Sequence, residues 1–337
     1  MDKNNIVEIK NLKLRFYQEE GTVKALNGVN IDIGSGEAVG VVGESGCGKS
    51  VTAFSLLRLL PSSAEIVTGE IKYRKPDNEV LNLAKVDPNG EIIRKIRGGE
   101  ISIIFQEPMT AFSTLYTIGN QISENLLIHQ DITKNEAKDK SIELLRKVGI
   151  SNPEQRVDEY PFQFSGGMRQ RAMIAMAIAC DPRLLIADEP TTALDVTIQA
   201  QVLKLIRDMR DDYDLSLMLI THDLGVIAHM VERIYVMYLG YIMESASAYQ
   251  LFKNPQHPYT RDLLKSIPKV TGTEGELASI VGTVPDAYNL PTGCPFHNRC
   301  QEKKEICTKN PPELKEIDTD HYVSCFLHEK EEVKKHA

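Results

Sequence analysis

Residues 43–50 read GESGCGKS, and this short segment has the residue types needed to hold a chain of phosphates. It fits the pattern G-x-x-x-x-G-K-[ST], in which the glycines let backbone N–H groups turn toward phosphate oxygens. Lys49 would bring positive charge to the β- and γ-phosphates, and Ser50 would offer a hydroxyl to Mg²⁺. We therefore expect nucleotide contacts from Gly43, Glu44, Ser45, Gly46, Cys47, Gly48, Lys49, Ser50 and Val51.

The flanking sequence places this loop between a strand and a helix. Residues 38–42 (AVGVV) form a short apolar run that is typical of a buried strand. Residues 51–60 carry apolar side chains on roughly one helical face, and Pro61 follows, which predicts a helix that stops there. The N-terminus of such a helix adds the positive end of its dipole to an anion site. The context therefore supports phosphate binding.

Two adjacent carboxylates lie more than a hundred residues farther along the chain. Residues 183–187 (RLLIA) are almost continuously apolar and are followed by Asp188 and Glu189. A strand of this kind is central and buried, and its carboxyl end is the edge of the sheet where ligands bind. In P-loop ATPases the first acid at this strand end holds Mg²⁺ and the second can act as general base toward water. We therefore assign Asp188 to the metal and Glu189 to the base.

With further motifs in the same order, residues 1–255 resemble the ATP-binding subunits of ABC transporters. Gln106 is similar to the Q-loop glutamine of that family, and residues 164–170 (FSGGMRQ) are similar to its LSGGQ signature. Residues 193–195 resemble the D-loop, and His222 resembles the switch histidine. The signature departs from the family's pattern in its first and last positions, in a form similar to that of the peptide-importer branch.

The resemblance implies an α/β fold, with a P-loop ABC nucleotide-binding domain over residues 1–254. A RecA-like core would be joined by an antiparallel β subdomain and by an inserted helical subdomain at about residues 107–163. Alternating apolar and polar residues over 6–35 independently favour antiparallel strands. A small cysteine-containing C-terminal extension would follow over residues 255–337.

The resemblance also implies roles for single residues. Glu189, His222 and Gln106 would form the catalytic set, with His222 on the γ-phosphate and Gln106 near the attacking water. Gln106 would also join Ser50 and Asp188 around Mg²⁺.

The signature segment is expected to act on a nucleotide held by another chain. Ser165, Gly166 and Gly167 start a predicted helix, and small residues at that position leave backbone N–H groups free to face an anion. In the family the anion is the γ-phosphate bound by the opposite subunit. Because one nucleotide domain is evident here, the resemblance implies a second, homologous ATPase chain and a heterodimer.

The adenine is expected to stack on an aromatic residue upstream of the first apolar strand. Phe16 and Tyr17 both qualify, and the loop register favours Phe16.

Cys47 occupies a P-loop position where serine is common in the family. Its place near a helix N-terminus makes it a candidate reactive thiol.

Residues 255–337 narrow the function. The sequence QHPYT (256–260) and the proline-rich segment after it resemble oligopeptide and dipeptide importer ATPases. Nickel importers share the same branch, so the sequence leaves peptides and nickel chelates open. The resemblance implies two membrane permeases and, indirectly, an extracellular substrate-binding protein. Soluble ABC ATPases that act on DNA or ribosomes usually have two nucleotide domains or a long coiled coil, and the sequence shows neither.

Four of the six cysteines gather near the end of the sequence, at Cys294, Cys300, Cys307 and Cys325. Structural zinc sites usually contain a short C-x2–4-C pair, which this set lacks. Widely spaced cysteines suit an iron–sulfur cluster, and importer ATPases with this extension resemble ones that carry a [4Fe–4S] centre. Zinc, or no metal, remain the alternatives, and nearby histidines are possible substitute ligands: His297, His321 and His328.

Composition sets limits on the remaining classes. The chain has 337 residues, a formal net charge of −8 and a pI near 5.6, which disfavours broad nucleic-acid binding. The longest apolar runs fall far short of the ~20 residues that a membrane span needs. Residues 1–5 (MDKNN) lead directly into a strand pattern, and we expect no signal peptide. We therefore expect a peripheral protein at the cytoplasmic face of the membrane, with ATP and Mg²⁺ as cofactors.

Overall fold

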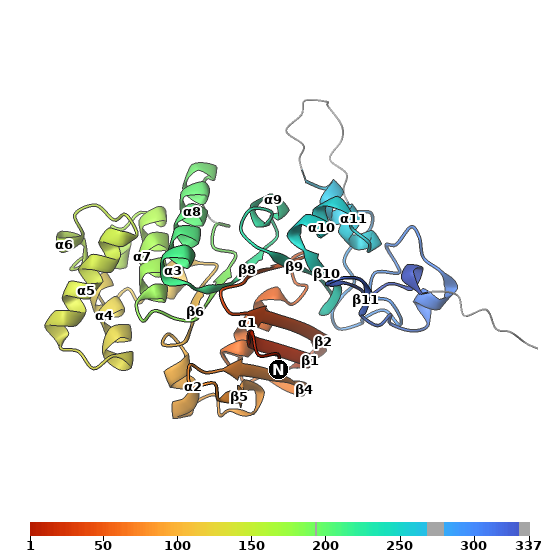
Figure 1. Ribbon diagram of the computed structural model, residues 1–337, viewed down its shortest axis with the longest axis horizontal. Helices are drawn as coiled ribbons and strands as arrows, with labels where there is room; N and C mark the ends of the chain where they lie inside the picture. Colours follow the sequence, from red (N-terminus) through yellow and green to blue (C-terminus); the bar gives the residue numbers. More distant parts are fainter. Residues whose placement is uncertain (193, 268–279, 330–337) are drawn as a thin grey trace, which may run out of the picture.

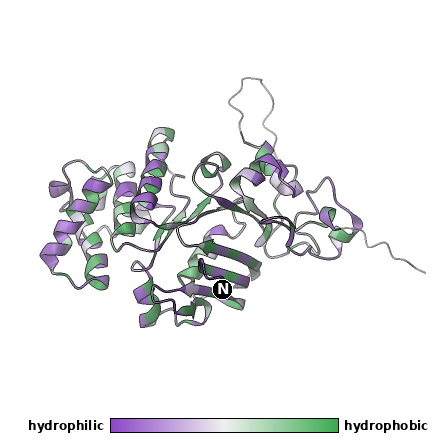
Figure 2. Ribbon diagram, viewed as in Figure 1, coloured by the Kyte–Doolittle hydropathy of each residue, from purple (hydrophilic) through white to green (hydrophobic). Residues whose placement is uncertain are grey.

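The computed structural model describes residues 1–192, 194–267 and 280–329, and two β-sheets organise this part of the chain (Figure 1). The smaller sheet has the strand order β2-β1-β4-β5 and is antiparallel throughout. The antiparallel strands predicted for residues 6–35 are therefore confirmed. In Figure 2, apolar and polar residues alternate along these strands, as expected for a sheet with one buried face. The strands are β1 (Asn5–Gln18), β2 (Gly21–Gly34), β4 (Ala64–Arg74) and β5 (Val80–Asn82).

The larger sheet has the order β11-β12-β10-β9-β3-β8-β7-β6, and its β9-β3-β8-β7-β6 section is parallel. Both faces of the parallel section are covered: Val39 and Val41 face one apolar cluster, and Ala38 and Val42 face the other. This explains why these strands read as continuous apolar runs. The parallel strands are β3 (Ala38–Val42), β6 (Ile101–Ile104), β7 (Leu184–Asp188), β8 (Ser216–Thr221) and β9 (Arg233–Tyr238).

The helix predicted over residues 51–60 is present, but its limits differ. Helix α1 runs from Lys49 to Leu56 and begins directly after Gly48. It ends before Pro61 because Arg58 adopts a left-handed backbone conformation, with φ of 54°. The remaining helices of the core are α2 (Glu91–Ile96), α7 (Gly166–Ile178), α8 (Val196–Tyr213), α9 (Leu224–Ile227) and α10 (Ala248–Lys253).

A group of helices forms one end of the molecule, at the left of Figure 1. Helices α4 and α5 pack against each other and against α7. Thr133 and Glu136 form a capping box that fixes the start of α5. The helical character predicted for residues 107–163 agrees with these elements: α3 (Pro108–Ala111), α4 (Ile118–His129), α5 (Lys134–Lys147) and α6 (Pro153–Arg156).

The C-terminal extension lies at the opposite end of Figure 1 and continues the larger sheet. Strand β12 pairs with β10, so the extension adds strands directly to the core. Its Tyr259 and Phe296 are fully buried, with ring centroids 4.8 and 5.5 Å from that of Tyr238 on β9. Within the described residues, no helix is long and apolar enough to cross a membrane. The core strand is β10 (Tyr241–Ser247), and the elements of the extension are α11 (Pro258–Lys265), β11 (Lys315–Asp318) and β12 (His321–Val323).

Candidate functional site

The loop of residues 43–48 joins β3 to α1, as predicted, and its shape depends on glycine. Gly43 has φ of 154°, and a Cβ there would lie 2.1 Å from the carbonyl oxygen of Met237. Gly48 has φ of 104°, and a Cβ there would lie 2.9 Å from the carbonyl oxygen of Ala25 on β2. Glycine is therefore required at both positions to let the loop pack between β9 and β2.

Lys49 and Ser50 begin α1 at the carboxyl ends of the parallel strands. Lys49 is 5% exposed, and its Nζ donates to the carbonyl oxygens of Gly43 and Glu44 at 2.9 and 3.2 Å. The Ser50 hydroxyl donates to Asp188 Oδ1 at 3.0 Å. The two residues assigned to Mg²⁺ by sequence are thus adjacent in space, although they are far apart in the chain.

Asp188 is a buried carboxylate at the end of β7, with 2% of its surface exposed. Burial raises its pKa above the usual value, although the hydrogen bond from Ser50 acts in the opposite direction. A cation beside it would compensate the cost of burying this charge. Carboxylate and hydroxyl oxygens are ligands that suit Mg²⁺, so the donor set fits the metal.

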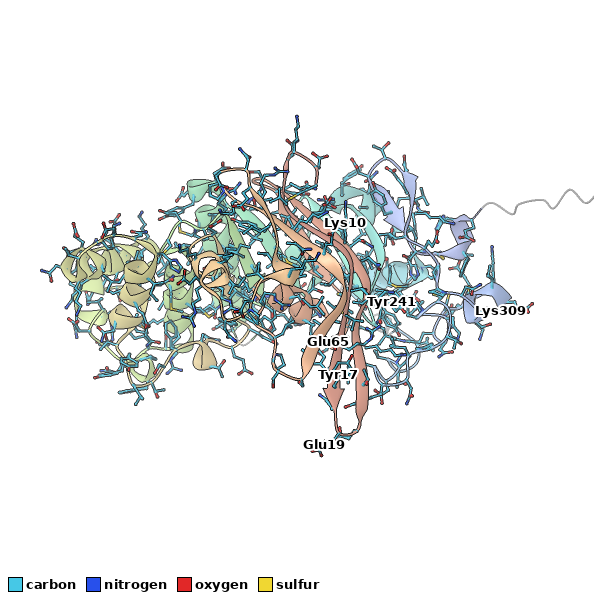
Figure 3. All side chains as sticks on the ribbon, turned by 90° about the horizontal axis from the view of Figure 1, so that it is seen from below. Lys10, Tyr17, Glu19, Glu65, Tyr241 and Lys309 are labelled. Atoms are coloured by element: carbon cyan, nitrogen blue, oxygen red, sulfur yellow. The ribbon has the colours of Figure 1, made fainter. Side chains whose placement is uncertain are left out.

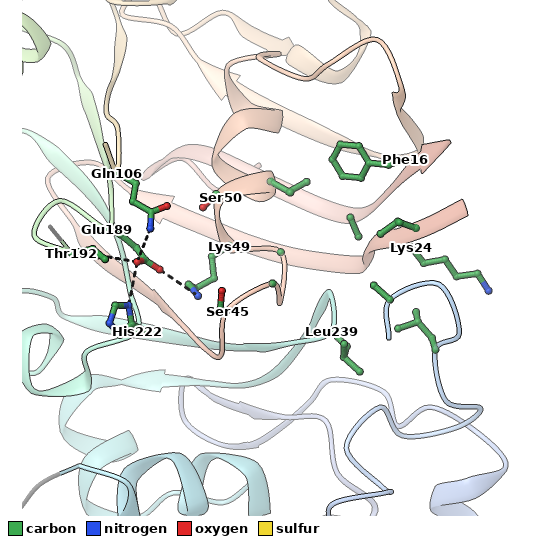
Figure 4. Close-up of a pocket in the computed structure, with 17 residues that line it drawn as sticks. Phe16, Lys24, Ser45, Lys49, Ser50, Gln106, Glu189, Thr192, His222 and Leu239 are labelled. Atoms are coloured by element: carbon green, nitrogen blue, oxygen red, sulfur yellow. Dashed lines mark hydrogen bonds and ion pairs between the residues drawn. The ribbon is translucent and has the colours of Figure 1, made fainter. Parts of the chain in front are cut away.

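Four polar side chains lie around the Glu189 carboxylate. Its Oε2 accepts a hydrogen bond from Thr192 Oγ1 at 2.9 Å and lies 3.2 Å from both Gln106 Nε2 and His222 Nδ1. Its Oε1 is 3.8 Å from Lys49 Nζ. Figure 4 shows these side chains converging on the carboxylate from different segments of the chain. The structure therefore brings together the three residues predicted to be catalytic.

The backbone of Glu189 is strained. Its φ of 45° lies in the left-handed region, which is uncommon for residues other than glycine. The strain is held by the backbone N–H, which donates to Ile220 of β8 at 2.9 Å. Such strain concentrates at functional sites, where it fixes a side chain in a required direction.

A pocket of roughly 620 Å³ extends from this carboxylate to the antiparallel sheet. Phe16 of β1 is part of its lining and stands at the far end from Glu189 in Figure 4. Tyr17 is not part of the lining; it lies beside Glu65, which raises the pKa of its hydroxyl, and Figure 3 shows the two side by side. This geometry favours Phe16 over Tyr17 as the stacking partner of a base.

The P-loop residues predicted to contact nucleotide divide into two groups. Most face the pocket, namely Ser45, Gly46, Gly48, Lys49, Ser50 and Val51. Gly43, Glu44 and Cys47 do not line it. The Gly43 carbonyl accepts from Lys49, and the Glu44 carboxylate pairs with Arg299 of the extension.

The prediction of a reactive thiol at Cys47 is wrong. The side chain is 2% exposed and packs in the apolar core beneath the loop. Burial raises its pKa to about 11, although the charge of Lys49 acts to lower it. A buried thiol that stays protonated is neither accessible nor nucleophilic at neutral pH.

The signature segment lies outside this pocket. Ser165 caps α7, and its Oγ accepts from the backbone N–H of Met168 at 3.3 Å. Ser165 and Gly166 are exposed, and a Cβ added at Gly166 would meet no atom of this chain within 4 Å. Of the segment resembling the D-loop, Ala193 lies outside the described residues.

Sequence reasoning missed several residues of the pocket. Thr192 closely follows the predicted strand and could have been found as a hydroxyl next to the two acids. The others carry no recognisable motif and join the pocket only through the fold: Val23, Lys24, Ala25, Leu239, Ala287 and Leu290. Two of these, Ala287 and Leu290, belong to the extension.

The four cysteines of the extension line one small cavity, and none forms a disulfide. Burial raises the pKa of Cys294 to about 12 and that of Cys325 to about 11, and neighbouring cysteines add to both shifts. His297 also lines the cavity. His321 is paired instead with Glu244, and His328 lies near the Gln256 carbonyl. Among the described residues, no group of three or more His, Cys, Asp or Glu side chains has the geometry to hold one metal ion.

Comparisons with known proteins agree with this geometry. Residues 26–192 match the family described as "ABC transporter", and residues 243–307 match "Oligopeptide/dipeptide transporter, C-terminal region". The "Probable peptide ABC transporter ATP-binding protein y4tR" of Sinorhizobium fredii is 48% identical, with 95% of this chain and 94% of that protein covered. The "Oligopeptide transport ATP-binding protein AppD" of Bacillus subtilis is 46% identical, with 97% and 98% covered.

Solved structures show the same core. The "Dimeric structure of a post-hydrolysis state of the ATP-binding cassette MJ0796 bound to ADP and Pi" superposes with a TM-score of 0.62 at 26% identity. It covers 72% of this chain and 98% of that chain, so the match includes the whole of the smaller protein. The chain is an ABC-type ATPase and belongs to the ABC transporter family of ATP-binding proteins, in the branch that carries the oligopeptide/dipeptide transporter C-terminal region.

Proposed function

We propose that this chain hydrolyses ATP to power the uptake of oligopeptides or dipeptides through partner permeases at the cytoplasmic face of a membrane. One observation carries the proposal: Lys49, Gln106 and His222 converge on the Glu189 carboxylate beside the P-loop. They do so in a chain whose extension matches that of peptide transport ATPases. The names of the relatives described above refer to peptide transport, which supports peptides as the substrate over the nickel chelates that the sequence left open.

The residues of the site have distinct tasks in hydrolysis. Backbone N–H groups of the P-loop and Lys49 would hold the β- and γ-phosphates. Ser50 and Asp188 would hold Mg²⁺, which would supply positive charge against the phosphates. Glu189 accepts a proton from the attacking water, and its position is fixed by Thr192. Gln106 orients that water and reaches the metal's surroundings, while His222 donates to the γ-phosphate. Phe16 stacks on the adenine.

The site is completed by a second ATPase chain, and its counterpart by Ser165, Gly166 and Gly167 of this one. The exposed signature supports this arrangement, because no atom of the described residues requires glycine at position 166. A requirement for glycine there would come from close approach of another molecule. The dimer named for the MJ0796 cassette supports a two-chain assembly. The partner would be a second, homologous ATPase chain, as the resemblance to importer ATPases implies.

The helical subdomain at residues 107–163 offers a surface for the permeases. Two grooves, of roughly 660 and 270 Å³, flank α4 and share the side chain of Ile128, which is 65% exposed. Leu115 and Phe162 of the same subdomain are 80% and 66% exposed. Exposed apolar side chains around grooves favour docking of an amphipathic helix, here one from a cytoplasmic loop of each permease. The extracellular substrate-binding protein would act through the permeases alone.

We further propose that Cys294, Cys300, Cys307 and Cys325 hold a [4Fe–4S] cluster. All four thiols line one cavity although Cys294 and Cys325 are 31 positions apart in the chain. Each thiolate of a cluster binds its own iron, so four cysteines around one cavity suit a cluster. The raised pKa values of Cys294 and Cys325 imply that binding would release protons. The role is structural, to stabilise a segment with little secondary structure.

The first prediction concerns the general base. Glu189→Gln keeps the hydrogen-bonding shape but removes the proton acceptor, so kcat should fall about 10²- to 10⁴-fold while ATP still binds. In the assembled transporter, uptake of labelled dipeptides and oligopeptides should fall with it. Glu79→Gln, on an exposed turn, is the control. Wild-type turnover in Glu189→Gln would mean that the base is misassigned or that the partner's site alone drives transport.

The second prediction concerns the signature. Gly166→Ala should leave the thermal unfolding and ATP affinity of the isolated chain unchanged, because the added methyl meets nothing within this chain. In the assembled pair it should lower ATPase activity about 10²-fold, since a γ-phosphate contact across the interface is disturbed. Full activity of the pair would show that this segment does not complete a hydrolysing site.

The third prediction concerns permease docking. Ile128→Asp places a charge in the shared wall of the two grooves and should abolish co-purification with the permeases without changing ATP binding. Val67→Asp, on the exposed face of β4, is the matched control. If Ile128→Asp still assembles, or if cross-links from the permeases reach only residues 255–329, the proposed surface is wrong.

The fourth prediction concerns the cysteines. Anaerobically purified protein should contain about four iron and four sulfide atoms per chain and absorb visible light through sulfur-to-iron charge transfer. The double variant with Cys300→Ser and Cys307→Ser should lose both the iron and sulfide content and the visible absorbance. The control Cys180→Ser, at a position outside the cavity, should keep both. Stoichiometric zinc without iron would exclude the cluster, and unchanged metal content in the double variant would exclude these ligands.

A further inference from the structure

The extension reaches the P-loop through an ion pair between the buried Arg299 and the partly buried Glu44. Arg299 Nη1 and Nη2 donate to the Glu44 carboxylate at 2.6 and 3.1 Å, in a two-pronged contact. The Arg299 side chain is 4% exposed and lies over the rings of Tyr238 and Phe296. Burial opposes its charge, yet the hydrogen bonds to Glu44 and Tyr238 hold its pKa above the usual value. The guanidinium therefore stays charged and fixed in one position.

A second contact from the extension fixes the loop backbone at the same residue. The N–H of Glu44 donates to the Tyr259 hydroxyl at 3.1 Å. Tyr259 and Phe296 belong to the aromatic cluster on β9, with their ring centroids 5.3 Å apart. The side chain and the backbone N–H of Glu44 are thus both held by residues of the extension.

The extension also forms one wall of the nucleotide pocket. Ala287 and Leu290 line the pocket together with Phe16 and Leu239. The Ala287 carbonyl accepts from the backbone N–H of Lys24 at 3.3 Å, which ties this wall to β2. These apolar side chains lie at the end of the pocket that holds Phe16, away from the catalytic carboxylate.

The contact between the extension and the antiparallel sheet continues to the tip of the β1–β2 hairpin. Tyr288 packs on Gly21, where a Cβ would lie 3.3 Å from its ring. The Tyr288 hydroxyl donates to Gln18 and lies 3.3 Å from Glu20. Residues 286–290 therefore dock along the hairpin that carries Phe16.

Charge explains why the Arg299 contact matters for nucleotide. Glu44 lies within the loop that surrounds the phosphates, and a free carboxylate there would repel a triphosphate. Arg299 neutralises it and, with Tyr259, holds the loop in one conformation. The apolar wall acts on a different part of the ligand, because it can only contact the base and sugar.

We propose that residues 286–299 of the extension are part of the nucleotide site, with Ala287 and Leu290 completing the pocket for the purine and Arg299 acting as a positioning residue for the P-loop. The nucleotide would thus be bound between the core and the extension, in addition to the Phe16 contact. Arg299 itself touches no phosphate and acts through Glu44.

Binding measurements with two ligands separate the two parts of this proposal. Isothermal titration of the full chain carrying Glu189→Gln would compare ATP with inorganic tripolyphosphate, which has no base. Arg299→Gln should weaken both ligands about tenfold, because the P-loop holds the phosphates common to them. Adding Glu44→Gln should restore most of the affinity, since it removes the unpaired carboxylate. A general loss of structure would not be relieved by a second substitution.

Leu290→Ala should act on the base alone. ATP affinity should fall about threefold to tenfold through lost apolar contact, while tripolyphosphate affinity stays unchanged. Arg261→Gln is the control: it removes another arginine of the extension, paired with Glu302 at 2.9 Å and absent from the pocket lining. Its affinities for both ligands should match those of the parent, and its thermal unfolding gives the reference for the other variants.

The outcomes that would overturn the proposal are equally specific. Arg299 would be excluded from the site if Arg299→Gln bound both ligands as tightly as the parent, or if adding Glu44→Gln did not restore the lost affinity. The apolar wall would be excluded if Leu290→Ala bound ATP as tightly as the parent, or if its affinities for ATP and tripolyphosphate fell equally. If Arg299→Gln fails to fold, Arg299→Lys keeps the charge but not the two-pronged contact, and should show a partial loss for both ligands; parent-like affinity would contradict the proposal.

Discussion

The site depends on the fixed backbone of the loop between β3 and α1. A phosphate-binding loop works only if its N–H groups point inward before the ligand arrives, since ordering them on binding would cost free energy. Here the loop is held from beneath by the β9 backbone at Gly43, where any side chain would collide with the Met237 carbonyl. It is held on its other side by hydrogen bonds from Gly240 to Cys47 and from Glu44 to Tyr259. The aromatic cluster of Tyr238, Tyr259 and Phe296 therefore helps to fix the backbone of the loop.

Around this loop the fold concentrates carboxylates, and it manages their repulsion by giving each a different partner. Asp188 is buried, which raises its pKa, and its Oδ1 accepts a hydrogen bond from Ser50; a cation beside it would compensate the cost of burying its charge. Glu189 has a strained backbone and faces Gln106 and His222. Glu44 is removed from the phosphates altogether by Arg299. Burial and pairing thus suit the three acids to different roles in the proposed site: Asp188 to the metal, Glu189 to the base and Glu44 to holding the loop.

Much of this could be predicted from the sequence, because the motif residues carry their own physical signals. Glycines with a following lysine and serine, and an apolar strand ending in two acids, are local patterns, and the structure brings Lys49, Ser50, Asp188 and Glu189 together as expected. Cys47 was misjudged because proximity to a helix N-terminus was visible in sequence and burial was not. Ala287, Leu290 and Arg299 were missed because they join the site through long-range packing, and nothing in their local sequence indicates it.

The proposed division of the site between two chains agrees with the same geometry. The residues that line the nucleotide pocket come from the P-loop, the ends of the parallel strands, the antiparallel sheet and the extension, whereas Ser165 and Gly166 lie outside it and are exposed. A Cβ added at Gly166 would meet no atom of the described residues within 4 Å, so the backbone at this helix start is open to a second molecule. In the proposed assembly, hydrolysis would require two chains to close on each other, and closure would move the helical subdomain with α7, because α4 and α5 pack directly on that helix. A permease helix docked at Ile128 would be carried along by this movement, so the packing of α4 against α7 would be the mechanical link between ATP and transport.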